Sequence, residues 1–138
     1  MVENANRYDH PMSFAIFDVD HFKDYNDCYG HTEGDKALAK VGQITRRATR
    51  KVDIPGRYGG EEFCVILPNT PIDCGVRVAK RLKCAIEKET KQPDLLSGLT
   101  ISIGLAQLKP KCTFMDLLNK ADEKLYGAKT SGRNRIVY

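Results

Sequence analysis

Two acidic segments, each placed where a predicted strand ends, carry the residue types best suited to chemistry in this chain. The sequence Arg-Tyr-Gly-Gly-Glu-Glu-Phe occupies residues 57–63, and an apolar run follows it at once. Its two glycines, Gly59 and Gly60, allow a tight turn and a close approach of the backbone to a ligand. Upstream, Asp18 follows the apolar residues of another predicted strand. Carboxylates gathered at neighbouring strand ends are the groups that Mg²⁺ and a nucleoside triphosphate require.

Length and composition predict one globular domain. The chain has 138 residues, of which 41% are hydrophobic and 29% are charged. The formal net charge of +4 suits a small polyanion but is too weak to predict binding to nucleic acid. No apolar stretch is long enough to cross a bilayer, and no signal peptide is recognisable. We therefore expect a cytoplasmic domain without membrane contact, even if its parent protein is anchored in a membrane.

Cysteine usage also favours a cytoplasmic domain. The five cysteines are odd in number, and none of them has CxxC spacing. This pattern favours reduced thiols over a disulfide framework or a zinc site.

Strand patterns are expected to hold both acidic segments in one sheet. Residues 13–19 are typical of a buried strand rich in Phe, Ile and Val, and residues 99–105 alternate as a half-buried strand should. The predicted hairpin covers residues 57–67 and turns at its two glycines. Residues 136–137 are expected to form an edge strand.

Three amphipathic patterns predict the helices that cover this sheet. A polar segment over residues 20–34 precedes the first helix, which opens at Asp35 and is ended by the Pro-Gly pair at 55–56. The others begin at Pro71 and at Thr113, which is expected to cap its helix. The remaining segments are predicted as loops: residues 92–98 and the basic residues 129–135. The order β, α, β-hairpin, α, β, α, β predicts an α+β fold of the ferredoxin-like (βαββαβ) type.

Four ordered motifs resemble the signatures of the GGDEF diguanylate cyclase family. The first motif is Asp-Val-Asp-His-Phe-Lys at 18–23, with Asn26-Asp27, Gly30-His31 and Gly34-Asp35 after it. The second is residues 57–63, in the variant with Glu at the third position, and the third is Thr-Ile-Ser-Ile-Gly at 100–104. The fourth consists of Ala121-Asp122, Leu125-Tyr126, Ala128-Lys129 and Gly-Arg-Asn at 132–134. The match runs from about residue 7 to the last residue.

This resemblance implies a bacterial signalling enzyme that joins two GTP molecules into cyclic di-GMP and releases two pyrophosphates. It also implies a nucleotidyl-cyclase or polymerase-palm-like sheet and a single catalytic domain over residues 1–138. The family usually begins with a longer helical segment, and the residues up to His10 resemble only the end of it. We therefore expect the chain to be part of a larger regulated protein.

The resemblance implies two Mg²⁺ ions, or Mn²⁺, in each active site. Their ligands would be Asp18, the carbonyl of Val19, Glu61 and Glu62. Glu61 is also the expected general base, and Lys23 is expected to stabilise charge on the attacked phosphate. The chemistry needs such a site, because a 3′-hydroxyl is a poor nucleophile near neutral pH and a metal lowers its pKa. Asp18 taken alone is explained equally well as a turn-capping residue.

The substrate contacts are also implied by the resemblance. Asn26 and Asp35 would recognise guanine, which presents donors at N1 and N2 and acceptors at O6 and N7. Further contacts to GTP are expected from the following residues: Phe22, Lys23, His31, Gly59, Gly60, Lys129 and Arg133. Several of these residues have a local explanation as well, because Asp35 suits a helix N-cap, Asn26 a turn, His31 a loop, and the lysines a solvated surface.

A further pattern, Arg50-Lys-Val-Asp53, lies just before the hairpin. It resembles the inhibitory RxxD site of the family, at which the product cyclic di-GMP binds away from the catalytic centre. A guanidinium pairs with phosphate or with guanine O6 and N7, and a carboxylate accepts from N1 and N2. Arg81 is the expected additional ligand. The pattern is also explained by an arginine that complements a helix dipole, followed by a solvated Asp53.

One domain binds one GTP, so the family reaction requires two domains that face each other as a homodimer. We therefore expect weak activity from the isolated chain, with a rate that rises steeply with concentration. The main competing hypothesis is a non-catalytic signalling module that binds GTP or cyclic di-GMP. The Gly-Gly-Glu-Glu-Phe hairpin argues against a mononucleotide cyclase or polymerase-like palm. The acidic residues clustered at strand ends argue against a purely structural protein.

Overall fold

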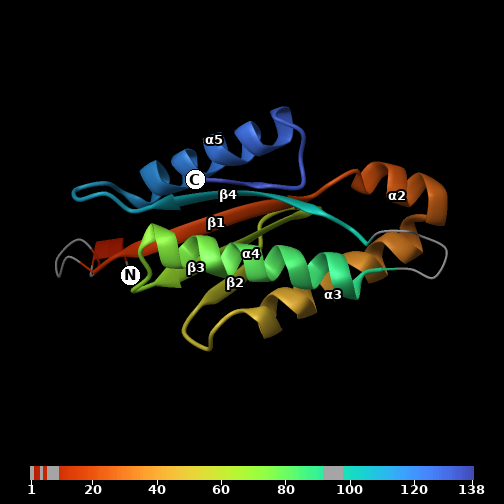
Figure 1. Cartoon of the computed structure of the whole chain (residues 1–138), viewed down its shortest axis with the longest axis horizontal. Helices are drawn as coiled ribbons and strands as arrows, with labels where there is room; N and C mark the ends of the chain where they lie inside the picture. Colours follow the sequence, from red (N-terminus) through yellow and green to blue (C-terminus); the bar gives the residue numbers. More distant parts are fainter. Residues whose placement is uncertain (1, 4, 6–9, 92–97) are drawn as a thin grey trace.

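The strand that carries Asp18 near its end lies at the centre of a five-stranded sheet (Figure 1). The computed structural model describes residues 2, 3, 5, 10–91 and 98–138. The order of the strands is β2-β3-β1-β4-β5. All pairs are antiparallel except β4 with β5, which is parallel. The strands are β1 (Met12–Val19), β2 (Ile54–Arg57), β3 (Glu62–Pro68), β4 (Ile101–Gln107) and β5 (Ile136–Val137).

Helices cover both faces of this sheet. Figure 1 shows α3 (His31–Ala48) and α4 (Ile72–Glu89) on one side and α5 (Phe114–Thr130) on the other, while α2 (Phe22–Tyr29) lies beyond the end of β1. Each side has its own apolar core, one built with α3 and α4 and the other with α5. The result is the α+β architecture that the element order predicts, to which the described residues add the helix α2.

The strand predicted at residues 99–105 forms as β4, but the prediction that it is half-buried is wrong. It is buried along both faces from Ile101 to Ala106. The reason is α5, which packs closely on the face that carries Ser102 and Gly104. A Cβ atom at Gly104 would lie 2.1 Å from the carbonyl oxygen of Ala121, so only glycine allows this approach.

The prediction for the polar segment at residues 20–34 is also wrong. It contains α2 and the first turn of α3, which begins at His31 rather than at Asp35. Phe22 is the one buried residue of α2, and most of the other residues of this short helix are polar. Pro55 and Gly56 lie in β2 rather than ending a helix.

The C-terminal half follows the sequence predictions more closely. Thr113 caps α5 through a reciprocal pair of hydrogen bonds with Asp116. The helix runs to Thr130, so Lys129 lies in its last turn and not in a loop. The loop predicted at 92–98 falls mainly outside the described residues. Within the described part of the chain, no helix has the length and apolar character that a membrane span needs.

Candidate active site

Strand pairing brings the two acidic segments together. In the antiparallel register of β1 and β3, Asp18 lies opposite Glu62. The backbone N–H of Val19 donates to the carbonyl oxygen of Glu61 over 3.3 Å. One residue further in, the rings of Phe17 and Phe63 stack with centroids 5.4 Å apart. The second half of the acidic turn (residues 59–62) is therefore held beside the end of β1 by strand pairing.

Asp18 has one carboxylate oxygen engaged and one without a partner. Its Oδ2 forms an ion pair with Nζ of Lys129. Its Oδ1 is buried and accepts no hydrogen bond from the residues that the structure describes. A buried oxygen without a partner is costly, and it marks a position suited to a ligand that supplies positive charge.

Glu61 lies in a crowded acidic environment. Burial, and next the charge of Asp18, raise the pKa of its carboxyl group, and Glu62 adds to this effect while Lys129 opposes it. A bound cation would relieve this repulsion. The oxygen donors therefore fit Mg²⁺ in chemical type. The described side chains of His, Cys, Asp and Glu do not, however, gather in threes around one metal position.

A cavity of about 290 Å³ opens at this end of the sheet. It joins acidic groups from β1 and the acidic turn to basic groups from α2, α5 and the segment after α5. Its lining contains seven residues predicted for the site: Asp18, Val19, Phe22, Lys23, Glu61, Lys129 and Arg133. Three further lining residues were not predicted: Asp20, His21 and Asp24. Carboxylates beside three cationic side chains suit a metal-bound triphosphate.

Asp20 is the structural residue that sequence reasoning missed. It is buried, and its carboxylate accepts hydrogen bonds from the hydroxyls of Thr100 and Ser102 at 2.7 and 2.6 Å. It also accepts from the backbone N–H of Asn134 at 3.0 Å. These bonds tie the end of β1 to β4 and to the segment that carries Arg133. The pairing of Asp20 with hydroxyls 80 or more residues away left no local sequence signal.

The two residues predicted to recognise guanine lie on consecutive helices. Asn26 is on α2, and Asp35 is on α3 directly after Gly34. Oδ1 of Asn26 is buried without a hydrogen-bond partner among the described residues, and it lies where a Cβ atom of Gly34 would be. Together with His31, which is exposed, they do not line the 290 Å³ cavity described above.

The Arg50 and Asp53 side chains are already paired with each other. The Arg50 guanidinium donates to both carboxylate oxygens of Asp53, and this hydrogen bonding raises the pKa of Arg50. It also donates to Thr70 and to the carbonyl of Pro68. The Asp53 side chain is fully buried, so it is not the solvated residue of the helix-dipole explanation. Arg81 donates to the carbonyl of Ala48 at the end of α3, and with Arg50 it lines a cavity of about 330 Å³.

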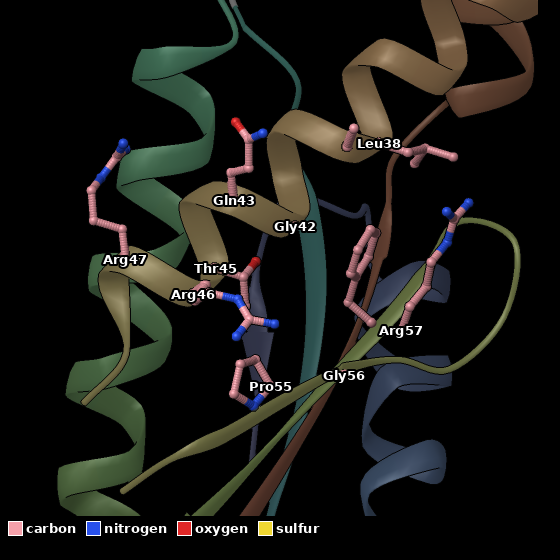
Figure 2. Close-up of a pocket in the computed structure, with 11 residues that line it drawn as sticks. Leu38, Gly42, Gln43, Thr45, Arg46, Arg47, Pro55, Gly56 and Arg57 are labelled. Atoms are coloured by element: carbon pink, nitrogen blue, oxygen red, sulfur yellow. The ribbon is translucent and has the colours of Figure 1, made fainter. Parts of the chain in front are cut away.

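A larger groove, of about 500 Å³, lies between α3 and the β2–β3 hairpin (Figure 2). Its wall on the hairpin side includes Gly56, Arg57 and Phe63, and its wall on α3 includes Gly42 and Arg46. None of the acidic residues of the turn lines this groove. Of the carboxylates predicted to bind metal, Asp18 and Glu61 line the smaller cavity, whereas Glu62 lines neither of the two.

Comparison with known proteins assigns the family. The family model described as the GGDEF domain of diguanylate cyclases matches residues 1–135. The chain belongs to the GGDEF family. Among curated relatives, YtrP of Bacillus subtilis, described as uncharacterized, is 41% identical over 126 residues, which are 90% of this chain and 21% of that protein. The diguanylate cyclase DgcM of Escherichia coli is 37% identical over 91% of this chain and 30% of its own length.

Solved GGDEF domains share the fold. The active GGEEF domain of a diguanylate cyclase from Vibrio cholerae aligns with a TM-score of 0.91 at 28% identity, covering 98% of this chain and 86% of that one. The GGDEF domain of DgcB from Caulobacter crescentus, solved in complex with c-di-GMP, aligns with a TM-score of 0.89 at 28% identity, covering 98% and 81%. The palm-like α+β fold predicted for this GGDEF domain is therefore confirmed. The chain spans only about a fifth to a third of the curated relatives.

Proposed function

We propose that this GGDEF domain condenses two GTP molecules into cyclic di-GMP and releases two pyrophosphates. The supporting observation is one cavity in which Asp18, with an unpartnered buried oxygen, lies beside Glu61 and three cationic side chains. The named cyclases among its relatives support the same reaction. Because GTP is a cytoplasmic substrate, we place the domain in the cytoplasm.

The metal ligands in this proposal are Asp18, the carbonyl of Val19, Glu61 and Glu62, which would hold two Mg²⁺ ions. When bound, Mg²⁺ lowers the pKa of the 3′-hydroxyl and neutralises charge on the triphosphate. Glu61 accepts the proton of the 3′-hydroxyl as this oxygen attacks the α-phosphorus of the other GTP. The bond from that phosphorus to the bridging oxygen breaks, and pyrophosphate leaves.

The cationic side chains bind the phosphates. Lys23 on α2 stabilises charge on the attacked phosphate, and Lys129 and Arg133 hold the rest of the triphosphate. The backbone of Phe22 and Lys23 adds N–H donors, since α2 begins there. Gly59 and Gly60 let the acidic turn approach the nucleotide without side-chain contact.

Guanine selection is assigned to α2 and α3. The carboxylate of Asp35 accepts from N1 and N2 of guanine, and Asn26 presents its amide N–H groups to a ring acceptor because its Oδ1 faces Gly34. Adenine would leave these groups unpaired. His31, at the start of α3, lines the nucleotide from the side.

Regulation by product is assigned to Arg50, Asp53 and Arg81. The exposed side of the Arg50 guanidinium and the nearby Arg81 present cationic donors beside the 330 Å³ cavity, which suits the phosphates and guanine edges of cyclic di-GMP. Asp53 contributes by holding Arg50 in place.

Because each domain binds one GTP, the reaction requires a homodimer. The test is the initial rate of cyclic di-GMP formation as a function of protein concentration, for the chain alone and fused to a dimeric coiled coil. The specific rate of the chain alone should rise with concentration, whereas that of the fusion should not. A specific rate that is constant for a chain shown to be monomeric would contradict the dimer mechanism.

A further inference from the structure

Arg57 ties the acidic turn to the end of β2. Its Nε donates to the carbonyl oxygens of Gly59 and Gly60, at 3.2 and 3.0 Å, and its Nη2 donates to Gly60 at 2.5 Å. The guanidinium carbon lies 5.9 Å from the centroid of the Phe63 ring, so the guanidinium also makes a cation–π contact with this ring. One side chain therefore contacts both glycine carbonyls and the first apolar residue after the turn.

These bonds act on the backbone of Glu61. The carbonyl of Gly60 and the N–H of Glu61 belong to the same planar peptide unit, so fixing the oxygen fixes the plane from which the Glu61 side chain projects. The carbonyl of Glu61 itself accepts from the N–H of Val19. Both peptide units that flank Glu61 are thus anchored, one to Arg57 and the other to β1.

Few contacts besides those of Arg57 hold the turn. Gly59 and Gly60 are exposed, and a Cβ atom at Gly60 would meet nothing within 4 Å, so packing does not fix this position. Two backbone bonds to the carbonyl of Glu62 also support it, from Tyr58 at 2.8 Å and from Gly59 at 3.2 Å. Two successive glycines have wide conformational freedom, which an ordering contact must overcome.

We propose that Arg57 is a positioning residue for the acidic turn. This inference rests on the proposed function. The role of Arg57 is to fix the Gly59 and Gly60 carbonyls, so that Glu61 and Glu62 are held where they bind metal. The guanidinium is suited to this role because its planar fork donates to two acceptors at once, which an ammonium group cannot do in the same geometry. Arg57 is exposed, so replacing it removes these contacts without opening a cavity in the core.

Arg46 provides a matched control. It lines the same groove and is also exposed, but its side chain makes no hydrogen bond or ion pair with a described residue (Figure 2). The comparison is therefore between Arg57→Ala, Arg57→Lys and Arg46→Ala. The first two readouts use protein without GTP: hydrogen exchange of the Tyr58 and Gly59 amides, and Mn²⁺ binding followed by paramagnetic line broadening.

Arg57→Ala should speed exchange of the Tyr58 and Gly59 amides about tenfold and weaken Mn²⁺ binding by a similar factor, as expected from losing hydrogen bonds to two carbonyls. Arg57→Lys should fall between Arg57→Ala and the unmodified protein. Arg46→Ala should match the unmodified protein in both measurements. In the dimeric fusion, Arg57→Ala should lower kcat and raise the Mg²⁺ requirement, with a smaller change in KM for GTP.

Equal exchange rates and Mn²⁺ affinities in Arg57→Ala and Arg46→Ala would overturn the positioning role. If Arg57→Ala does not fold, the same comparison is made with Arg57→Lys, and equality with Arg46→Ala again overturns it. A failure of the proposed function looks different: the unmodified protein would bind no Mn²⁺ or make no cyclic di-GMP. The exchange measurement would still decide what Arg57 does for the turn.

Discussion

The ammonium group of Lys129 forms an ion pair with the carboxylate of Asp18, although the two residues come from opposite ends of the chain. The contact joins the last turn of α5 to the end of β1. It also places a proposed phosphate-binding cation directly against a proposed metal ligand. Under the proposed function, Lys129 would compete with a metal for Asp18 and cooperate with the metal in binding phosphate.

Lys129→Met should change metal and nucleotide binding in opposite directions. Without nucleotide, Mn²⁺ should bind about five- to tenfold more tightly, because a partly buried ion pair no longer has to be broken. The KM for GTP should rise about tenfold, since a charge-assisted contact to phosphate is lost. Lys120→Met is the control, because Lys120 lies on the same helix but pairs with Glu123. Parallel changes in Mn²⁺ and GTP binding would contradict this account of Lys129.

The raised pKa of Glu61 should appear as a pH-dependent difference in stability between the unmodified protein and Glu61→Gln. In the folded protein Glu61 keeps its proton at pH values where the unfolded chain has lost it. Its stabilising contribution is therefore complete below the ordinary pKa of 4.5 and is lost as pH rises through the raised value. In metal-free thermal unfolding, Glu61→Gln should match the unmodified protein at low pH and exceed its Tm near neutral pH. A Tm difference that does not vary with pH would be the contrary result.

Gly34→Ala should weaken GTP binding through Asn26. A Cβ atom at Gly34 would lie 1.7 Å from Oδ1 of Asn26, so the amide must move away from its position. Losing one recognition contact should raise the KM for GTP about tenfold. Gly42→Ala is the control on the same helix, since its Cβ would lie 3.7 Å from Phe63, an ordinary contact. That control should leave KM unchanged and stabilise α3 by about 0.5–1 kcal/mol. Equal KM values in the two variants would remove Asn26 from guanine recognition.

Some of this site could be predicted from the sequence, and some could not. The end of β1 and the acidic turn were predictable because apolar runs and a Gly-Gly pair are local signals. The helix α2 was missed because it is only eight residues long and Phe22 is its one buried residue. The bonds of Asp20 to Thr100 and Ser102, and of Lys129 to Asp18, depend on the register of distant segments, which leaves no periodic trace.

Arg50→Ala should relieve product inhibition without reducing the initial rate. The measurement is the progress curve of the dimeric fusion with and without added cyclic di-GMP, together with product affinity by calorimetry. The variant should also lose about 1–2 kcal/mol of stability, because the buried Asp53 keeps only its backbone donor. Lys51→Ala, an exposed neighbour of the same charge, is the control. An initial rate that falls in parallel with product binding would show that the two sites are not separate.

The most direct test of the proposed function is to identify the product formed from GTP and Mg²⁺. The chain fused to a dimeric coiled coil is incubated with both, and the products are separated by chromatography and identified by mass, for the unmodified protein and for Glu61→Ala. We expect cyclic di-GMP and pyrophosphate from the unmodified fusion. We expect the rate to fall by at least about a thousandfold in Glu61→Ala, which should still bind cyclic di-GMP. GTP left unchanged by a folded, dimeric and GTP-bound fusion would contradict the cyclase assignment and favour a non-catalytic binding module.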